Sequence, residues 1–228
     1  MIVGVPKEIK DNEKRVGLTP FGVKELTLSG HQVLIETTAG LGSGFTDNKY
    51  IKSGAKIVSD MHGIYNASDL IVKVKEPQPN EVALIRENQV VFTFFHFAAD
   101  KQLTDGIINS KSIAIAYETI EDANSSLPIL VPMSEVAGRM SVQNGAKCLE
   151  GSMGGKGKLI SGVPGVEPAV VTVIGGGVVG TNAAKLAAGL GAKVNILDVN
   201  MDRLRYLDDI MPKNVSTIYS NSSNIEHL

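Results

Sequence analysis

The feature that most constrains the fold is a glycine pattern directly after an apolar, strand-like run. Val170–Ile174 consists of β-branched residues, and Gly175, Gly177 and Gly180 follow with the spacing G-x-G-x-x-G. The first glycine allows a tight turn, the second lets a pyrophosphate approach the backbone, and the third lets the next helix pack near the sheet. The N-terminus of that helix offers unpaired N–H groups to phosphates. The pattern predicts a dinucleotide-binding strand, turn and helix.

An acidic residue closes the next predicted strand. Asp198 follows an apolar run, at the position where such a fold places a carboxylate against the adenosine ribose. A carboxylate repels a 2′-phosphate, which favours NAD over NADP. Arg203 and Arg205 are the alternative, since a nearby arginine can hold a 2′-phosphate, and Arg203 is also a candidate to lie over the adenine ring. Ser220 ends a third strand, where nucleotide contacts are expected.

The alternative for this region is a glycine-rich turn in an α/β protein that binds no nucleotide. A lone glycine pattern would favour that alternative. Here the strand, the helix, the second strand and the acid are in register, so we interpret the region as a nucleotide site.

Strand-like runs alternate with helix signals along the whole chain, which is typical of parallel sheets covered by helices. We predict an α/β protein with two Rossmann-like, doubly wound parallel-sheet domains, the second incomplete because only its first mononucleotide half is present. The boundary separates residues 1–127 from 128–228, where Ser125–Pro128 and Val131-Pro132 interrupt the pattern. The predicted strands are Ile2–Val5, Gln32–Ile35, Leu70–Val74, Val90–Phe94, Ser112–Ala116, Val170–Ile174, Lys193–Leu197 and Val215–Tyr219.

Helix starts are predicted at two places. Thr19-Pro20 pairs an N-cap residue with proline at the first helical position, and a second helix is expected from Ser134 to about Leu149. Taken alone, Ser134 is more simply an N-cap than a ligand-binding residue.

Composition excludes several classes of protein. The formal net charge of −2 gives no basic field for nucleic acid or for an anionic membrane, and no segment has the apolar length of a membrane span. The single cysteine, Cys148, precludes an internal disulfide framework, so we expect a reducing, cytoplasmic location. No set of His, Cys or acidic residues has metal-ligand spacing, so no metal is expected.

Three polar residues of the first domain lie at or beyond the carboxyl ends of predicted strands, where open α/β sheets bind ligands. Arg15 can hold a carboxylate through two parallel hydrogen bonds, and Lys75 adds a second positive charge. His96 carries an imidazole, which can accept and donate a proton. The simpler alternatives are a solvated Arg15, a strand-end Lys75 and a hydrogen-bonded core His96.

Several longer motifs resemble the alanine dehydrogenase and transhydrogenase NAD-binding subunit family. The N-terminal ones are similar to both branches, and the later ones to alanine dehydrogenases in particular. In chain order they are Val5–Glu8, Asn12–Pro20, Val72–Pro77, Phe92–Ala98, Pro132–Arg139 and Val173–Gly180.

The resemblance implies an NAD-dependent enzyme that reversibly converts L-alanine to pyruvate and ammonium, with its active site between two domains. It implies that Arg15 and Lys75 bind the substrate and that His96 is the catalytic acid/base. The matching cofactor positions are Ser134, Gly175, Gly177, Val178, Asp198, Arg203 and Ser220. It also implies a homo-oligomer, commonly a hexamer, acting in amino-acid catabolism.

Members of this family extend well beyond residue 228, and the additional part holds the rest of the nucleotide sheet and a catalytic aspartate. We therefore expect this chain to be truncated and inactive by itself. Two alternative functions remain open at this point. One is a transhydrogenase NAD-binding subunit or a saccharopine dehydrogenase relative, and the other is a nucleotide-binding module without turnover.

Overall fold

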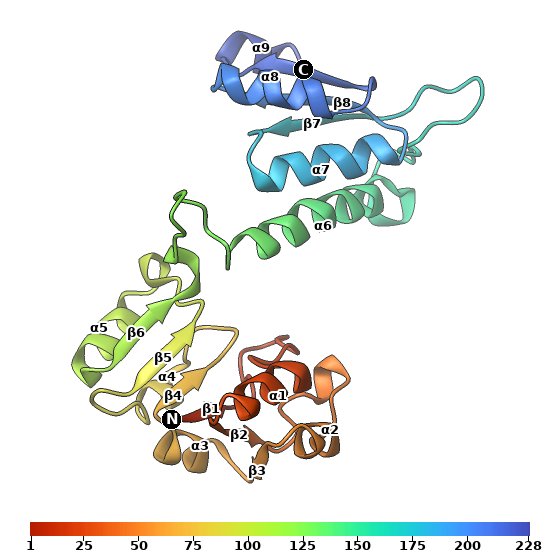
Figure 1. The fold of residues 1–228 in the computed structure, drawn as a ribbon. Helices are drawn as coiled ribbons and strands as arrows, with labels where there is room; N and C mark the ends of the chain where they lie inside the picture. Colours follow the sequence, from red (N-terminus) through yellow and green to blue (C-terminus); the bar gives the residue numbers. More distant parts are fainter. The chain divides into compact units, whose positions relative to one another are not determined.

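The chain folds as two units, which are described separately below. A computed structural model describes residues 1–228, and contacts within the chain divide it into unit 1, Met1–Leu127, and unit 2, Pro128–Leu228 (Figure 1).

Unit 1 is built on a six-stranded parallel sheet with the strand order β3-β2-β1-β4-β5-β6. The chain first builds outward from β1 and then crosses back to place β4 on the other side of β1. The gap between the carboxyl ends of β1 and β4 is therefore a topological switch point, where open α/β sheets bind ligands. The strands are β1 (Ile2–Val5), β2 (Gln32–Glu36), β3 (Lys56–Val58), β4 (Leu70–Val72), β5 (Val90–Thr93) and β6 (Ile113–Ala116).

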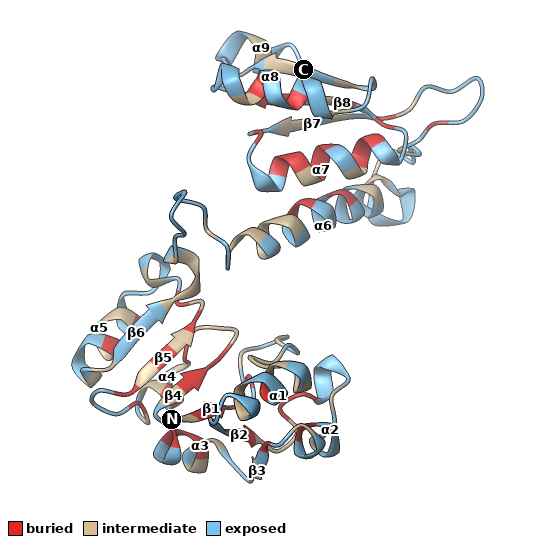
Figure 2. Ribbon diagram, in the orientation of Figure 1, coloured by how far each residue is buried: buried red, intermediate tan, exposed pale blue.

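Hydrophobic cores cover both faces of this sheet, because alternate residues of a strand point to opposite sides. On one face Val5 and Ile35 pack with residues of α1 (Pro20–Leu28) and α2 (Asp47–Lys52). On the other, Ile71 and Val91 pack with α3 (Met61–Ala67) and α5 (Lys101–Ser110). Figure 2 shows these buried segments in red. The remaining short helices are α4 (Pro79–Val82), η1 (Leu41–Ser43), η2 (Phe97–Ala99) and η3 (Tyr117–Thr119).

Unit 2 contains a three-stranded parallel sheet in the order β7-β8-β9, formed by Val170–Ile174, Lys193–Asp198 and Val215–Tyr219. Its core is formed mainly by alanines of α7 (Val178–Gly189) against β8, together with Leu207 of α8 (Met201–Ile210). α6 (Val131–Leu149) packs closely on α7, since a Cβ at Gly138 would lie 2.2 Å from the Val179 carbonyl oxygen. The unit also contains η4 (Gly151–Met153) and α9 (Ser222–Glu226).

The predicted fold class is confirmed, with corrections to individual elements. Thr19 caps α1, accepting from the Gly22 N–H at 3.3 Å. The strand β3 was not predicted, because its three residues are too few for a clear alternation. The predicted strands Leu70–Val74 and Val90–Phe94 are too long, since β4 ends at Val72 and β5 at Thr93.

The start of α6 was also predicted too late. The helix begins at Val131, because Pro132 fits its first turn, where no N–H partner is required. Ser134 is therefore inside the first turns of the helix, and the N-cap interpretation of this residue is wrong.

None of the helices combines the length and the apolar character that crossing a lipid bilayer requires.

Candidate functional site

The glycine loop after β7 has the backbone geometry that its sequence predicts. Gly175 has φ of 101°, a left-handed conformation that glycine adopts without strain, and its N–H donates to the Leu197 carbonyl at 2.7 Å. A Cβ at Gly180 would lie 1.8 Å from the Gly175 carbonyl oxygen, so only glycine allows α7 to start this close to the strand. Gly177 is the N-cap of α7, and a Cβ there would meet nothing within 4 Å. The loop thus leaves open space in front of the helix N-terminus.

A pocket of ≈ 770 Å³ in unit 2 adjoins this loop. Its walls come from α6, β7 and the first turn of α7, and they include Ser134, Gly175, Gly177, Val178 and Gly180. The fold therefore brings Ser134, from a separate helix, to the same pocket as the glycines.

Asp198 is the last residue of β8 and holds the glycine loop from the sheet side. Its Oδ2 accepts from the Gly176 N–H at 2.7 Å, and its Oδ1 accepts from the Asn200 N–H at 2.8 Å. The backbone hydrogen bonds from Asn200 and Gly176 lower the pKa of this carboxyl, so it is ionised at neutral pH. Each oxygen has a second lone pair with which to accept a ribose hydroxyl.

The two arginines of α8 have different surroundings. The Arg203 Nε donates to the Gly176 carbonyl at 2.7 Å, and its Nη2 donates to the Thr181 hydroxyl at 2.8 Å. Arg203 thus braces the glycine loop, whereas Arg205 is solvent-exposed and pairs with Asp202 at 2.6 Å. Ser220 follows β9 directly, and its N–H donates to the Asp198 carbonyl at 3.0 Å.

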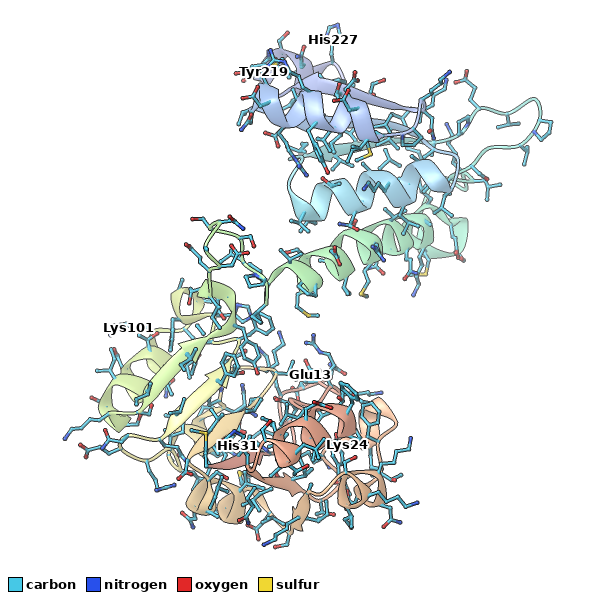
Figure 3. All side chains as sticks on the ribbon, viewed as in Figure 1. Glu13, Lys24, His31, Lys101, Tyr219 and His227 are labelled. Carbon is cyan, nitrogen blue, oxygen red and sulfur yellow. The ribbon has the colours of Figure 1, made fainter.

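In unit 1, Arg15 is held by a carboxylate from its own loop. The Arg15 Nε donates to Glu13 Oε1 at 2.8 Å, and its Nη2 donates to Glu13 Oε2 at 2.7 Å. The side-chain hydrogen bond from Arg15 is the main cause that lowers the pKa of Glu13 to about 2, and the charge of Lys75 contributes less. Arg15 is exposed and lines a pocket of ≈ 180 Å³ with Glu8 and Glu13. Figure 3 labels Glu13 among the loops of unit 1.

Lys75 lies a few residues beyond β4, on the other side of the switch point from the Arg15 loop. Its carbonyl accepts from the Thr93 hydroxyl at 2.8 Å, which ties its loop to β5. The side chain is half-buried, and its charge acts on the same Glu13 that binds Arg15. Lys75 therefore lies near enough to the Arg15–Glu13 pair for its charge to act on Glu13.

His96 lies beyond the end of β5, the strand next to β4. It is exposed, so the interpretation of His96 as a core histidine is wrong; the buried residue is its neighbour Phe95. The imidazole stacks on the Phe94 ring with 6.0 Å between centroids and 11° between planes. Its backbone is left-handed, with φ of 52°.

Sequence reasoning missed a buried ionic cluster beneath these loops. Lys73 Nζ lies 2.7 Å from Glu81 Oε1 and 3.2 Å from Glu8 Oε2, and all three side chains are almost fully buried. Glu8 Oε1 also accepts from the Val74 N–H at 2.7 Å, and Tyr65 donates its hydroxyl to Glu81 at 3.3 Å. The cluster joins the loop after β1 to the loop after β4. The available signal was a lysine inside an otherwise apolar run, Leu70–Val74.

Burial of this cluster shifts the pKa of one of its carboxyl groups. Two carboxylates share one ammonium group, and desolvation raises the pKa of Glu8 above its usual range although Lys73 opposes that shift. Burial therefore favours the protonated form of Glu8 in this cluster.

Comparison with known proteins relates both units to one family. The family model described as "Alanine dehydrogenase/PNT, N-terminal domain" matches residues 4–137, and the corresponding C-terminal domain model matches residues 141–228. The alanine dehydrogenase of Methanococcus maripaludis is 55% identical over 225 residues, which are 99% of this chain and 60% of that protein.

Solved structures give the same result. An L-alanine dehydrogenase matches with a TM-score of 0.94 and 51% identity, over all of this chain and 63% of the other. A transhydrogenase from Sinorhizobium meliloti matches with a TM-score of 0.81 and 25% identity, over all of this chain and 64% of the other.

The chain thus spans about 60% of the length of the curated relatives that it matches. Its fold is of the dehydrogenase type, which accommodates a nucleotide cofactor. On the matches of both domain models, the chain belongs to the alanine dehydrogenase/PNT family.

Proposed function

We propose that this chain carries the substrate-binding residues and the first half of the cofactor site of an NAD-dependent L-alanine dehydrogenase. The main support is its 51–55% identity to alanine dehydrogenases over nearly its whole length. The grouping of Arg15, Lys75 and Glu13 at the switch point of a 3-2-1-4-5-6 sheet agrees with such a site.

The residues of unit 2 fit a dinucleotide. Gly175, Gly177 and Gly180 form a backbone turn with open space before α7, whose N-terminus favours a pyrophosphate. Asp198 is an ionised acceptor for ribose hydroxyls, and its charge disfavours a 2′-phosphate, which selects NAD. Val178 and Ser134, which line the pocket, and Ser220, whose N–H donates to the Asp198 carbonyl, complete the proposed contacts, and Arg203 braces the loop.

In the proposed reaction, L-alanine, water and NAD give pyruvate, ammonium, NADH and a proton. The cofactor supplies the hydride acceptor. Arg15 and Lys75 bind the substrate carboxylate and orient its α-carbon, with Lys75 also polarising the developing carbonyl oxygen. Loss of the α-hydride converts alanine to the corresponding imine of pyruvate. His96 takes the proton from the water that adds to this imine, and it returns a proton in the reverse direction.

Two experiments test this function. The purified chain is titrated calorimetrically with NAD and with pyruvate, and we expect both to bind, with Arg15→Ala removing pyruvate binding alone. Turnover is measured in a chimera in which this chain replaces the matching 225 residues of the M. maripaludis enzyme, and we expect NADH formation that depends on L-alanine. A folded chimera without that activity contradicts the proposal.

A nucleotide-binding role of the transhydrogenase type is the second candidate, favoured by the solved structural relative. Cofactor binding without pyruvate binding, together with a chimera that is inert toward alanine, would support it instead.

A further inference from the structure

Glu118 makes an unusual set of contacts to the backbone of the neighbouring strand end. Its carboxylate accepts from the Phe95 N–H at 3.1 and 3.3 Å, through Oε1 and Oε2 respectively, and its Oε1 accepts from the His96 N–H at 2.6 Å. Glu118 belongs to η3, which follows β6, the strand that pairs with β5. A side chain from one strand end therefore holds two consecutive amides of the next.

The backbone that it holds is strained. His96 has φ of 52°, and a residue with a Cβ rarely adopts this left-handed conformation unless its surroundings impose it. A carboxylate is a strong acceptor for two backbone N–H groups, and such charge-assisted hydrogen bonds are stronger than neutral ones. The contacts with Glu118 thus offset the strain at His96.

The same segment also supports the imidazole ring. Tyr117, next to Glu118, packs edge-on against Phe94 with 5.0 Å between ring centroids, and Phe94 stacks on His96. η3 therefore supplies an anchor for the His96 backbone and, through Phe94, a support for its side chain.

We infer that Glu118 is a positioning residue for His96, holding its backbone left-handed so that the imidazole projects from the sheet edge against Phe94. The consequence for catalysis rests on the proposed function, in which His96 exchanges protons. The effect of Glu118 on the backbone conformation of His96 does not depend on the proposed function, and it can be measured in the chain itself.

The test is NMR spectroscopy of the purified chain, observing His96 directly. A left-handed residue has a short distance between its amide proton and α-proton, and hence a strong intraresidue Overhauser effect. Two matched variants separate reach from charge. Glu118→Gln keeps the length and one acceptor oxygen, whereas Glu118→Asp keeps the charge but withdraws it by one methylene.

We expect Glu118→Gln, which keeps a neutral acceptor oxygen within reach of both amides, to retain a weaker Overhauser effect and ring-current shift from Phe94, and Glu118→Asp and Glu118→Ala to lose both. Glu121→Ala, at an exposed position of the same loop, is the control and leaves both unchanged. Retention of the left-handed signature in folded Glu118→Asp, or its loss in the control, overturns the inference.

Kinetics of the chimera separate this inference from the proposed function. If the unsubstituted chimera turns over, Glu118→Asp lowers kcat on the order of 100-fold, as misplacement of a reacting group does, with little change in KM for alanine. A rise in the KM for alanine with kcat unchanged contradicts the inference. An inert chimera in which Glu118→Asp still releases His96 contradicts the proposed function and supports the positioning role.

Discussion

Among single residues, His96 carries the clearest consequence for chemistry. In the chimera, we expect His96→Ala to lower turnover by roughly two or more powers of ten, as the loss of a general acid/base does. NAD affinity is expected to stay unchanged, because the proposed nucleotide contacts are all in unit 2. Steady-state kinetics and calorimetry measure the two effects. His31→Ala, at a half-buried turn before β2, is the control, and near-normal turnover of His96→Ala would remove the acid/base role.

Asp198 is the residue that we expect to determine the choice between NAD and NADP. The chain is expected to bind NAD more tightly than NADP, because the ionised carboxylate repels a 2′-phosphate. Asp198→Asn removes the charge and keeps one acceptor for the Gly176 N–H, so it reduces this preference. Calorimetric titration of both cofactors is the measurement, with exposed Asp202→Asn as the control. Equal binding of NADP by the unsubstituted chain would identify Arg203 or Arg205 as a phosphate ligand.

At the scale of elements, α7 offers a matched pair of glycines. Gly180→Ala places a Cβ 1.8 Å from the Gly175 carbonyl oxygen, so the helix must move from the strand at a cost of about 1–3 kcal/mol. Gly189→Ala meets nothing within 4 Å and is expected to be neutral or to stabilise the helix by about 0.5–1 kcal/mol. Urea unfolding measures both free energies. Similar values for the two variants would show that the glycine loop adapts easily.

The buried cluster couples the loops after β1 and β4, and its stability depends on pH. Lys73→Met leaves Glu8 and Glu81 buried without a counter-charge, which costs about 3–5 kcal/mol near pH 7. The raised pKa of Glu8 means that the folded state binds more protons than the unfolded state above pH 4.5, so stability falls as pH rises.

Lys73→Met is therefore expected to regain part of its lost stability between pH 7 and pH 5, as the buried carboxyls become protonated. Urea unfolding at both values tests this. Lys101→Met, whose side chain is 87% exposed, is the control and should lose little at either pH. If Lys73→Met instead loses more of its free energy of unfolding at pH 5 than at pH 7, the assignment of charges is contradicted.

For the whole molecule, we expect two unfolding transitions in calorimetry, because each unit has its own core. Unit 2 is expected to unfold first, since its sheet has three strands and β7 exposes Val170 and Ile174. Added NAD should raise the midpoint temperature of only that transition, because a ligand stabilises the unit that binds it. The glycine-loop variant Gly180→Ala is the control, and it should lower the midpoint temperature of the same transition. One cooperative transition would contradict the division.

Features that depend on local patterns were predictable from the amino-acid sequence. Alternating strand and helix signals predicted the α/β class, which the structure confirms. The glycine spacing predicted a turn at Gly175 and a tight helix start at Gly180, because backbone sterics at these positions depend on the absent Cβ. Arg15, Lys75 and His96 were predicted as site residues because parallel strands bring their carboxyl ends to one edge, and their roles stay a prediction.

The neighbours of these groups became known from the folded structure and not from the sequence. The partners of Lys73 are Glu8 and Glu81, and those of Asp198 include Gly176, all contacts between segments that sequence periodicity does not pair. His96 is likewise exposed and left-handed, and its N–H donates to Glu118, a residue of the neighbouring strand end. Side-chain hydrogen bonds depend on distances in space, and residue spacing along the chain predicts those distances only within an element.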